Sequence, residues 1–146
     1  MRKLTLVAVL LALGFTAHAA TSAKPQVHVS HAWIRVLPGA LPAGGYATIS
    51  NTGDAPLTLT GASSPAYANV MLHKSSMRNG MSHMRMVKQL KLPAHATVKF
   101  APGGYHLMLM QATHKVSPGD TVPVTLHFAD GSQLKVDFTA RPANAH

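Results

Sequence analysis

The chain has 146 residues, with 13 lysines and arginines against four acidic residues, ten histidines, eight methionines and no cysteine. The absence of cysteine excludes disulfides, thiolate zinc sites, a nucleophilic cysteine, a blue-copper thiolate and a lipid-modified cysteine. The length suits one domain, and 47% apolar residues with only 12% charged residues describe a chain that can fill a core. The net charge is +9, but aromatic residues make up only 5% and the basic residues are scattered, so we do not expect nucleic-acid binding.

The N-terminus has the pattern of a secretory signal peptide. A basic start precedes an apolar stretch from Leu4 to Phe15, and Ala17-His18-Ala19 places small residues at the two positions that a signal peptidase reads. A membrane anchor would need about 20 apolar residues, which is more than this stretch supplies. We therefore predict that residues 1–19 are a signal peptide. Residues 20–146 are then a single domain with no integral membrane segment, soluble in the oxidising periplasm of a bacterium.

The remaining chain has the rhythm of an antiparallel β-sandwich. Clusters of Gly, Pro or Asn interrupt it regularly, and the segments between them alternate with a period of two. No long apolar pattern at helical spacing follows the N-terminal stretch. The predicted strands are 27–36, 45–51, 57–62, 69–74, 81–87, 96–100, 106–111, 121–128 and 133–139. The last two are expected to form a hairpin across Ala129-Asp130-Gly131, with one buried face.

Methionine and histidine gather in one part of this pattern. Five of the eight methionines fall within sixteen residues, and these are Met71, Met77, Met81, Met84 and Met86. His73 and His83 lie among them, and His106 is followed at alternate positions by two more methionines. The sequence therefore places nitrogen and sulfur donors together.

The period of a strand sorts these donors by face. Because residues two apart on a strand share a face, His106 and Met108 should point one way, while Leu107 and Leu109 point the other way. The same rule pairs Met71 with His73, and Met84 with Met86. One strand can therefore present an imidazole and a thioether side by side.

If the segments around His73, Met84 and His106 meet at one end of the sandwich, they form a pocket of two nitrogens and two sulfurs. Thioethers bind Cu(I) well and Zn²⁺ or Mg²⁺ poorly, and imidazole suits copper in either oxidation state. Methionine also needs no deprotonation and forms no disulfide in an oxidising compartment. Against this, methionine commonly fills gaps in cores, and a lone histidine is more often packed or on the surface. The spacing of the residues has to decide.

That spacing resembles a known family. Ten residues separate His73 from Met84, twenty-one separate Met84 from His106, and one separates His106 from Met108. This spacing is similar to the metal-binding pattern of the periplasmic copper chaperones called the PCu(A)C family. The resemblance covers most of the mature chain. Its other segments are His31-Ala32-Trp33-Ile34-Arg35, Gly45-Tyr46-Ala47-Thr48-Ile49-Ser50-Asn51, Leu92-Pro93-Ala94 and Pro102-Gly103-Gly104-Tyr105-His106-Leu107-Met108.

The resemblance implies a cupredoxin-like β-sandwich with Greek-key connections that binds one Cu(I) per chain at an exposed end. It implies that the ligands are His73, Met84, His106 and Met108. It further implies a carrier and not an enzyme, passing copper by ligand exchange toward the CuA centre in subunit II of cytochrome c oxidase, directly or through a Sco-type protein. We expect the chain to act as a monomer.

Other functions remain as alternatives. Copper storage or resistance without a dedicated acceptor would differ from carriage by its stoichiometry, with several loosely bound ions in place of one tight ion. Electron transfer lacks the thiolate that tunes blue copper. A copper oxidase would use mostly nitrogen ligands and a substrate pocket, which nothing in the sequence marks. A plain interaction module would leave the methionine cluster accidental.

Further residues lie near the pattern but outside it, namely Met77, Met81, Met86, Met110 and His83. The segment from Met77 to Met81 is expected to be a mobile turn whose methionines could collect copper from a donor. Met84, expected on a loop, is the candidate for a ligand that swings away, with the two pattern histidines as firmer anchors. Basic residues around the cluster could steer docking onto an acidic partner, and these are Lys74, Arg78, Arg85, Lys88 and Lys91.

Overall fold

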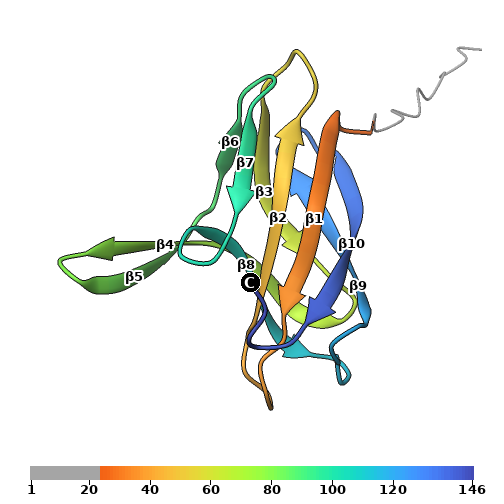
Figure 1. Ribbon diagram of the computed structural model, residues 1–146. Coiled ribbons are helices and arrows are strands. Elements are labelled where there is room, and N and C mark those ends of the chain that lie inside the picture. Colours follow the sequence, from red (N-terminus) through yellow and green to blue (C-terminus); the bar gives the residue numbers. More distant parts are fainter. Residues whose placement is uncertain (1–23) are drawn as a thin grey trace, which may run out of the picture.

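The computed structural model describes residues 24–146, so the predicted signal peptide lies outside the described residues. The described chain consists of strands joined by turns and loops (Figure 1). The strands are β1 (Val27–Arg35), β2 (Ala43–Asn51), β3 (Leu57–Ser63), β4 (Tyr67–Arg78), β5 (Met81–Met86), β6 (Leu90–Leu92), β7 (Thr97–Phe100), β8 (Tyr105–Ala112), β9 (Thr121–Phe128) and β10 (Gln133–Arg141). The all-β prediction is confirmed. Between residues 24 and 146 there is no helix long and apolar enough to cross a membrane.

The strands form one continuous sheet that folds over on itself. Their order is β5-β4-β8-β7-β2-β1-β10-β9-β3-β6, and β8 also pairs with β2. Most neighbouring strands are antiparallel, as predicted, but β1 and β10 are parallel. Strands β7 and β8 are also parallel where they pair, through Phe100 and Tyr105 alone. The parallel pair brings the first strand against the last and so ties together the two ends of the described chain.

The observed strands follow the predicted rhythm with two differences. The three-residue strand β6, whose Leu90 and Leu92 are buried against β3, was not predicted, because three residues are too few to show an alternating pattern. The strand predicted at 69–74 extends in fact from Tyr67 to Arg78. This extension carries β4 beyond the body of the sandwich.

The core lies between the two halves of the folded sheet. The β9–β10 hairpin has the predicted pairing, with Leu126 opposite Leu134 and Val124 opposite Val136. All of the inward residues of β9 are at most 3% exposed. From the other half, Leu107 and Leu109 of β8 are buried in the same core. Alternation with period two therefore fixes which face of each strand is inside.

The β4–β5 hairpin projects from this body (Figure 1). Its turn consists only of Asn79 and Gly80, with φ of 49° and 75°. Asn-Gly is the preferred pair where both turn residues need a positive φ, as in a type I′ turn. The turn predicted between Met77 and Met81 is therefore present, but both methionines belong to strands. Met84 also lies on a strand, β5, and not on the expected loop.

Candidate metal centre

Two histidines face each other where the hairpin leaves the body. His73 of β4 is directly opposite His106 of β8, and their ring centroids are 5.8 Å apart with an interplanar angle of 76°. Directly opposite residues of an antiparallel pair lie on the same face of the sheet. The two imidazoles, distant in sequence, are thus brought together on one surface.

The orientation of His106 is fixed by its surroundings. Its side chain is only 6% exposed, its ring lies 6.5 Å from the ring of Tyr46, and its Nδ1 is 3.1 Å from the carbonyl oxygen of Gly104. Since a carbonyl oxygen only accepts hydrogen bonds, Nδ1 carries the hydrogen and donates it. The lone pair of the neutral ring is therefore on Nε2, which is free to bind a metal ion. Such a backbone acceptor is the usual means of orienting a metal-binding histidine.

His73 is a partly buried imidazole. Its Nδ1 is buried and has no partner among the described residues. Burial, and secondly the neighbouring His106, lower the pKa of His73 below its usual value of 6.5. The ring is therefore neutral at pH 7, with a lone pair available. A buried nitrogen without a partner is unusual in a folded protein and fits a position that a metal ion would satisfy.

Methionine residues flank the two histidines on the same face of the sheet. Met108 is two residues from His106, and Met71 lies directly opposite Met108. On the other side, Met86 lies directly opposite His73, while Met84 is opposite Ser75 and so is the diagonal neighbour of His73. We call this surface of β5, β4 and β8 the methionine face. Its members are His73, His106, Met71, Met77, Met84, Met86, Met108 and Met110.

The four residues of the sequence pattern thus share one face, with the two histidines in direct contact range. The pattern did not single out Met71 and Met86, although strand register places both opposite residues of the pattern. The two-residue spacing from Met71 to His73, which puts both on one face of a strand, was the sequence signal that could have identified Met71. Met81 and His83, also considered near the pattern, lie on the opposite face of the hairpin because they pair with Arg78 and Ser76.

Carboxylates are absent from this surface. Within residues 24–146, no group of three or more His, Asp or Glu side chains is arranged to hold a metal ion. The four aspartates all lie outside β4, β5 and β8, and Asp54, for example, is 2.8 Å from the exposed His95. No carboxylate can therefore complete a coordination shell at the histidine pair, and the thioethers on this face favour a soft metal.

An aromatic wall borders the methionine face. Gly44 of β2 is opposite Met108, and the side chain of Tyr46 lies over this glycine. A Cβ at position 44 would come within 2.6 Å of the Tyr46 hydroxyl. Tyr46 in turn packs on Trp33, with ring centroids 4.7 Å apart. Glycine at this position therefore lets the tyrosine ring lie close to the site.

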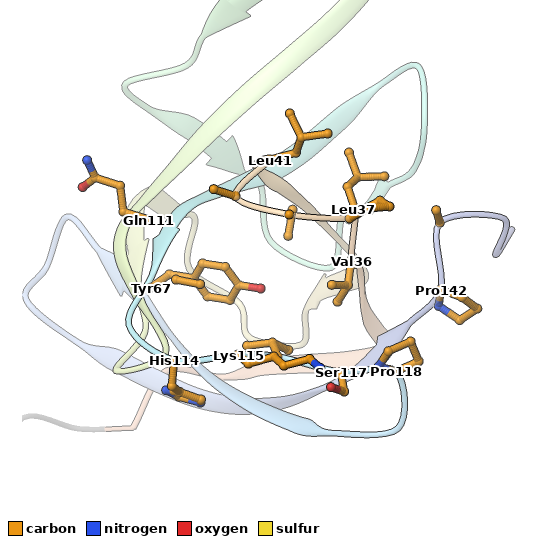
Figure 2. A pocket seen from close by; sticks show the side chains of 17 residues that line it. Val36, Leu37, Leu41, Tyr67, Gln111, His114, Lys115, Ser117, Pro118 and Pro142 are labelled. Carbon is orange, nitrogen blue, oxygen red and sulfur yellow. The ribbon is translucent and has the colours of Figure 1, made fainter.

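A large cavity lies elsewhere in the molecule. It has a volume of about 980 Å³ and is bordered by the loop after β1, the loop after β8 and the chain beyond β10. Leu37, Leu41 and Tyr67 are among the side chains that line it (Figure 2). No residue of the methionine face contributes to its lining, so it is separate from the candidate metal centre.

Solved PCuAC domains have a fold similar to that of this chain. The copper-bound PCuAC domain from PmoF2 matches 82% of this chain and 96% of its own with a TM-score of 0.68 and 25% identity. The solution structure of CuI-DR1885 from Deinococcus radiodurans matches 85% of this chain and 83% of its own, with a TM-score of 0.63 and 30% identity. The chain thus has the cupredoxin-like β fold of PCuAC copper-chaperone domains.

Sequence comparison gives the family more narrowly. Residues 27–140 match the family described as "Putative lipoprotein LpqE-like". The "Putative lipoprotein Lxx21020" of Leifsonia xyli subsp. xyli is 34% identical over 144 residues, which is 93% of this chain and 86% of the relative. The chain belongs to the LpqE-like family.

Proposed function

We propose that this protein is a Cu(I) chaperone that binds one ion per chain through His73, Met84, His106 and Met108. The observation that carries the proposal is the direct pairing of His73 with His106 on a face that holds thioethers and no carboxylate. Two neutral nitrogens and two neutral sulfurs match the preference of Cu(I) and suit Zn²⁺ or Mg²⁺ poorly. Copper in the related PmoF2 and DR1885 structures supports the same assignment.

The differing exposure of the ligands suits transfer without catalysis. His106 is 6% exposed and hydrogen-bonded, so it is the anchor, whereas Met84 is 52% exposed and is not packed in the core. An acceptor can replace Met84 first and form a mixed complex before the histidines let go. The acceptors proposed are the CuA site in subunit II of cytochrome c oxidase or a Sco-type protein, each of which offers thiolates that bind Cu(I) more strongly.

The face of the hairpin opposite the methionine face is basic. By strand register, Lys74, Arg78 and Arg85 lie there together, and no aspartate is present on β4 or β5. A small cleft of about 200 Å³ is lined by Ser76, Arg78, His83, Met84 and Arg85. We propose that this basic face, with Lys88 and Lys91 nearby, attracts an acidic surface on the acceptor. Added salt should then slow transfer, because screening weakens long-range attraction.

The proposed location is the periplasm, after removal of residues 1–19, with the mature chain acting as a monomer. The relative from Leifsonia xyli is named a lipoprotein, but the present sequence has no cysteine to which a lipid could be attached. Methionine ligands suit that compartment, since they remain competent where exposed thiols form disulfides.

Copper storage is the second candidate, because the methionine face holds six sulfurs and one Cu(I) needs only two of them. The two functions differ in stoichiometry. A chaperone binds one ion tightly, whereas a storage protein binds several ions with similar affinity.

An anaerobic titration with Cu(I) against a competing chelator tests the proposal. We expect one tight ion per chain for the native protein and clear weakening in His106→Ala and Met108→Ala. Zinc serves as the control metal and should bind much more weakly. Equal affinities for zinc and Cu(I) would contradict the proposal, and several equivalent Cu(I) ions would favour storage instead.

A further inference from the structure

The methionine face continues past the histidine pair toward the tip of the projecting hairpin. Met77 is 69% exposed and is separated from the turn by one residue, while Met84 is 52% exposed and lies between Met77 and the histidines. Met84 is opposite Ser75, so both His73 and Met77 are its diagonal neighbours. Diagonal neighbours across a strand pair are about 7–8 Å apart, within reach of long flexible side chains. One thioether can therefore approach either neighbour.

Packing does not account for these methionines. Five large apolar side chains are exposed among the described residues, and four of them are methionines of this hairpin: Met77, Met81, Met84 and Met86. Methionine usually fills irregular gaps in a core, which these exposed side chains do not do. Their sulfurs are left accessible to a soft ion arriving from solvent or from a donor protein.

We propose that Met77 and Met84 form an outer, transient Cu(I) position, from which Met84 carries the ion to His73. The proposal rests on the function proposed above. In the step, the bond from Cu(I) to the Met77 sulfur breaks as the bond to the His73 nitrogen forms, while Met84 remains bound. Copper stays in the +1 state and no electron is transferred. Two neutral thioethers form a weaker site than the inner set, so the ion moves inward.

The hairpin itself supplies a matched control. Met81 lies on the other side of the Asn79-Gly80 turn from Met77 and is 61% exposed. It is opposite Arg78, on the basic face, whereas Met77 is opposite Ser82, on the methionine face. A general attraction of thioethers for copper would involve Met77 and Met81 equally. A route along the methionine face involves only Met77.

The test compares Met77→Leu with Met81→Leu in the mature chain. Capture of Cu(I) from a chelator complex is followed by stopped flow, and the affinity of the tight site is measured separately by chelator competition. For Met77→Leu we expect capture to slow about tenfold, or roughly 1.4 kcal/mol in the barrier, with the affinity of the tight site unchanged. For Met81→Leu we expect neither quantity to change.

A second measurement locates the outer position directly. Silver(I) serves as a diamagnetic substitute for Cu(I), and the methionine methyl groups are labelled with ¹³C for NMR. In the double variant His73→Ala/His106→Ala, which lacks the inner nitrogens, silver(I) should shift the methyl signals of Met77 and Met84 and leave that of Met81 unmoved. An unmoved Met77 signal would overturn the outer position.

The outcomes separate the two proposals. Unchanged capture in both variants, or equal slowing in both, overturns the outer position and leaves the chaperone function in place. Loss of tight binding in Met77→Leu also overturns it, because Met77 would then belong to the inner site. A native protein without a tight Cu(I) site overturns the proposed function itself.

Discussion

The β9–β10 and β4–β5 hairpins have the same secondary structure, but side chains of different kinds alternate between their two faces. In β9–β10, one residue in two is buried, so that Leu126 and Phe138 are at most 1% exposed. In β4–β5, every residue of β5 is exposed, and the alternation places Met77, Met84 and Met86 on one face and the basic residues, together with Met81, on the other. A period of two therefore sorts side chains by chemistry as readily as by burial. The first hairpin contributes to the stability of the core, whereas the side chains of the second are accessible to a metal ion or a partner.

The largest expected effect is on stability and separates the two hairpins. Leu126→Ala removes a fully buried side chain from β9 and should lower the free energy of unfolding by about 2–5 kcal/mol. Met86→Ala, on the exposed β5, should change it by less than about 0.5 kcal/mol. Urea unfolding of the metal-free protein followed by circular dichroism measures both. Comparable losses in the two variants would show that the projecting hairpin is packed in solution.

Copper affinity should distinguish two methionines within the projecting hairpin. Met84→Leu removes a proposed ligand and should weaken Cu(I) binding about tenfold or more, whereas Met86→Leu should have a much smaller effect. Both side chains are about half exposed and lie on the same face, so each variant is a control for the other. The reverse order would assign the ligand to Met86, which register places directly opposite His73.

A smaller effect on Cu(I) affinity is expected from a change in the body of the protein beside the site. Gly44→Ala places a Cβ against the Tyr46 hydroxyl and should displace the ring that packs beside His106. We expect a loss of about 1–3 kcal/mol in unfolding free energy and a weakening of Cu(I) binding by a few fold. Gly61→Ala on β3 is the control, because no atom lies within 4 Å of its added Cβ. Equal behaviour of the two variants would remove Tyr46 from the support of the site.

The smallest expected effect is a dependence of the free energy of unfolding on pH, caused by His73, which lies where the β4–β5 hairpin leaves the body. The pKa of His73 is lowered by burial and by His106, so the folded metal-free protein binds fewer protons than the unfolded chain between that pKa and 6.5. The free energy of unfolding should therefore rise with pH across this window and then level off, as far as His73 is concerned. NMR titration of the His73 ring checks the shift. In His106→Ala the pKa of His73 should move back up, and a further fall would contradict the assignment.

Much of this arrangement could be predicted from local sequence, because the period of a strand is a local property. Alternation alone placed His106 and Met108 on one face and Leu107 and Leu109 on the other, and it gave the β9–β10 pairing. The Asn79-Gly80 dipeptide marked a turn, because both residues tolerate a positive φ.

The pairing register between strands that are separate in sequence could not be predicted from alternation within each strand. Whether Met84 or Met86 lies opposite His73 depends on how β5 pairs with β4, and whether Met71 approaches Met108 depends on β4 and β8. These pairings follow from the turn length and from packing of the whole sheet. The extent of β4 was underestimated for a related reason. Its outer half has no buried face, so hydrophobic alternation ends at Leu72 while the strand continues.

The two-residue turn at Asn79-Gly80 also affects the thermodynamics of the proposed metal capture. A long loop would have to surrender backbone freedom on closing around an ion, at about 1–2 kcal/mol per residue. Here the backbones of β4 and β5 are already aligned up to the tip, so that entropy has been lost during folding. Only side-chain rotamers are left to order, and each methionine loses at most about 2 kcal/mol in that step. The proposed binding and release of copper therefore require no local folding or unfolding.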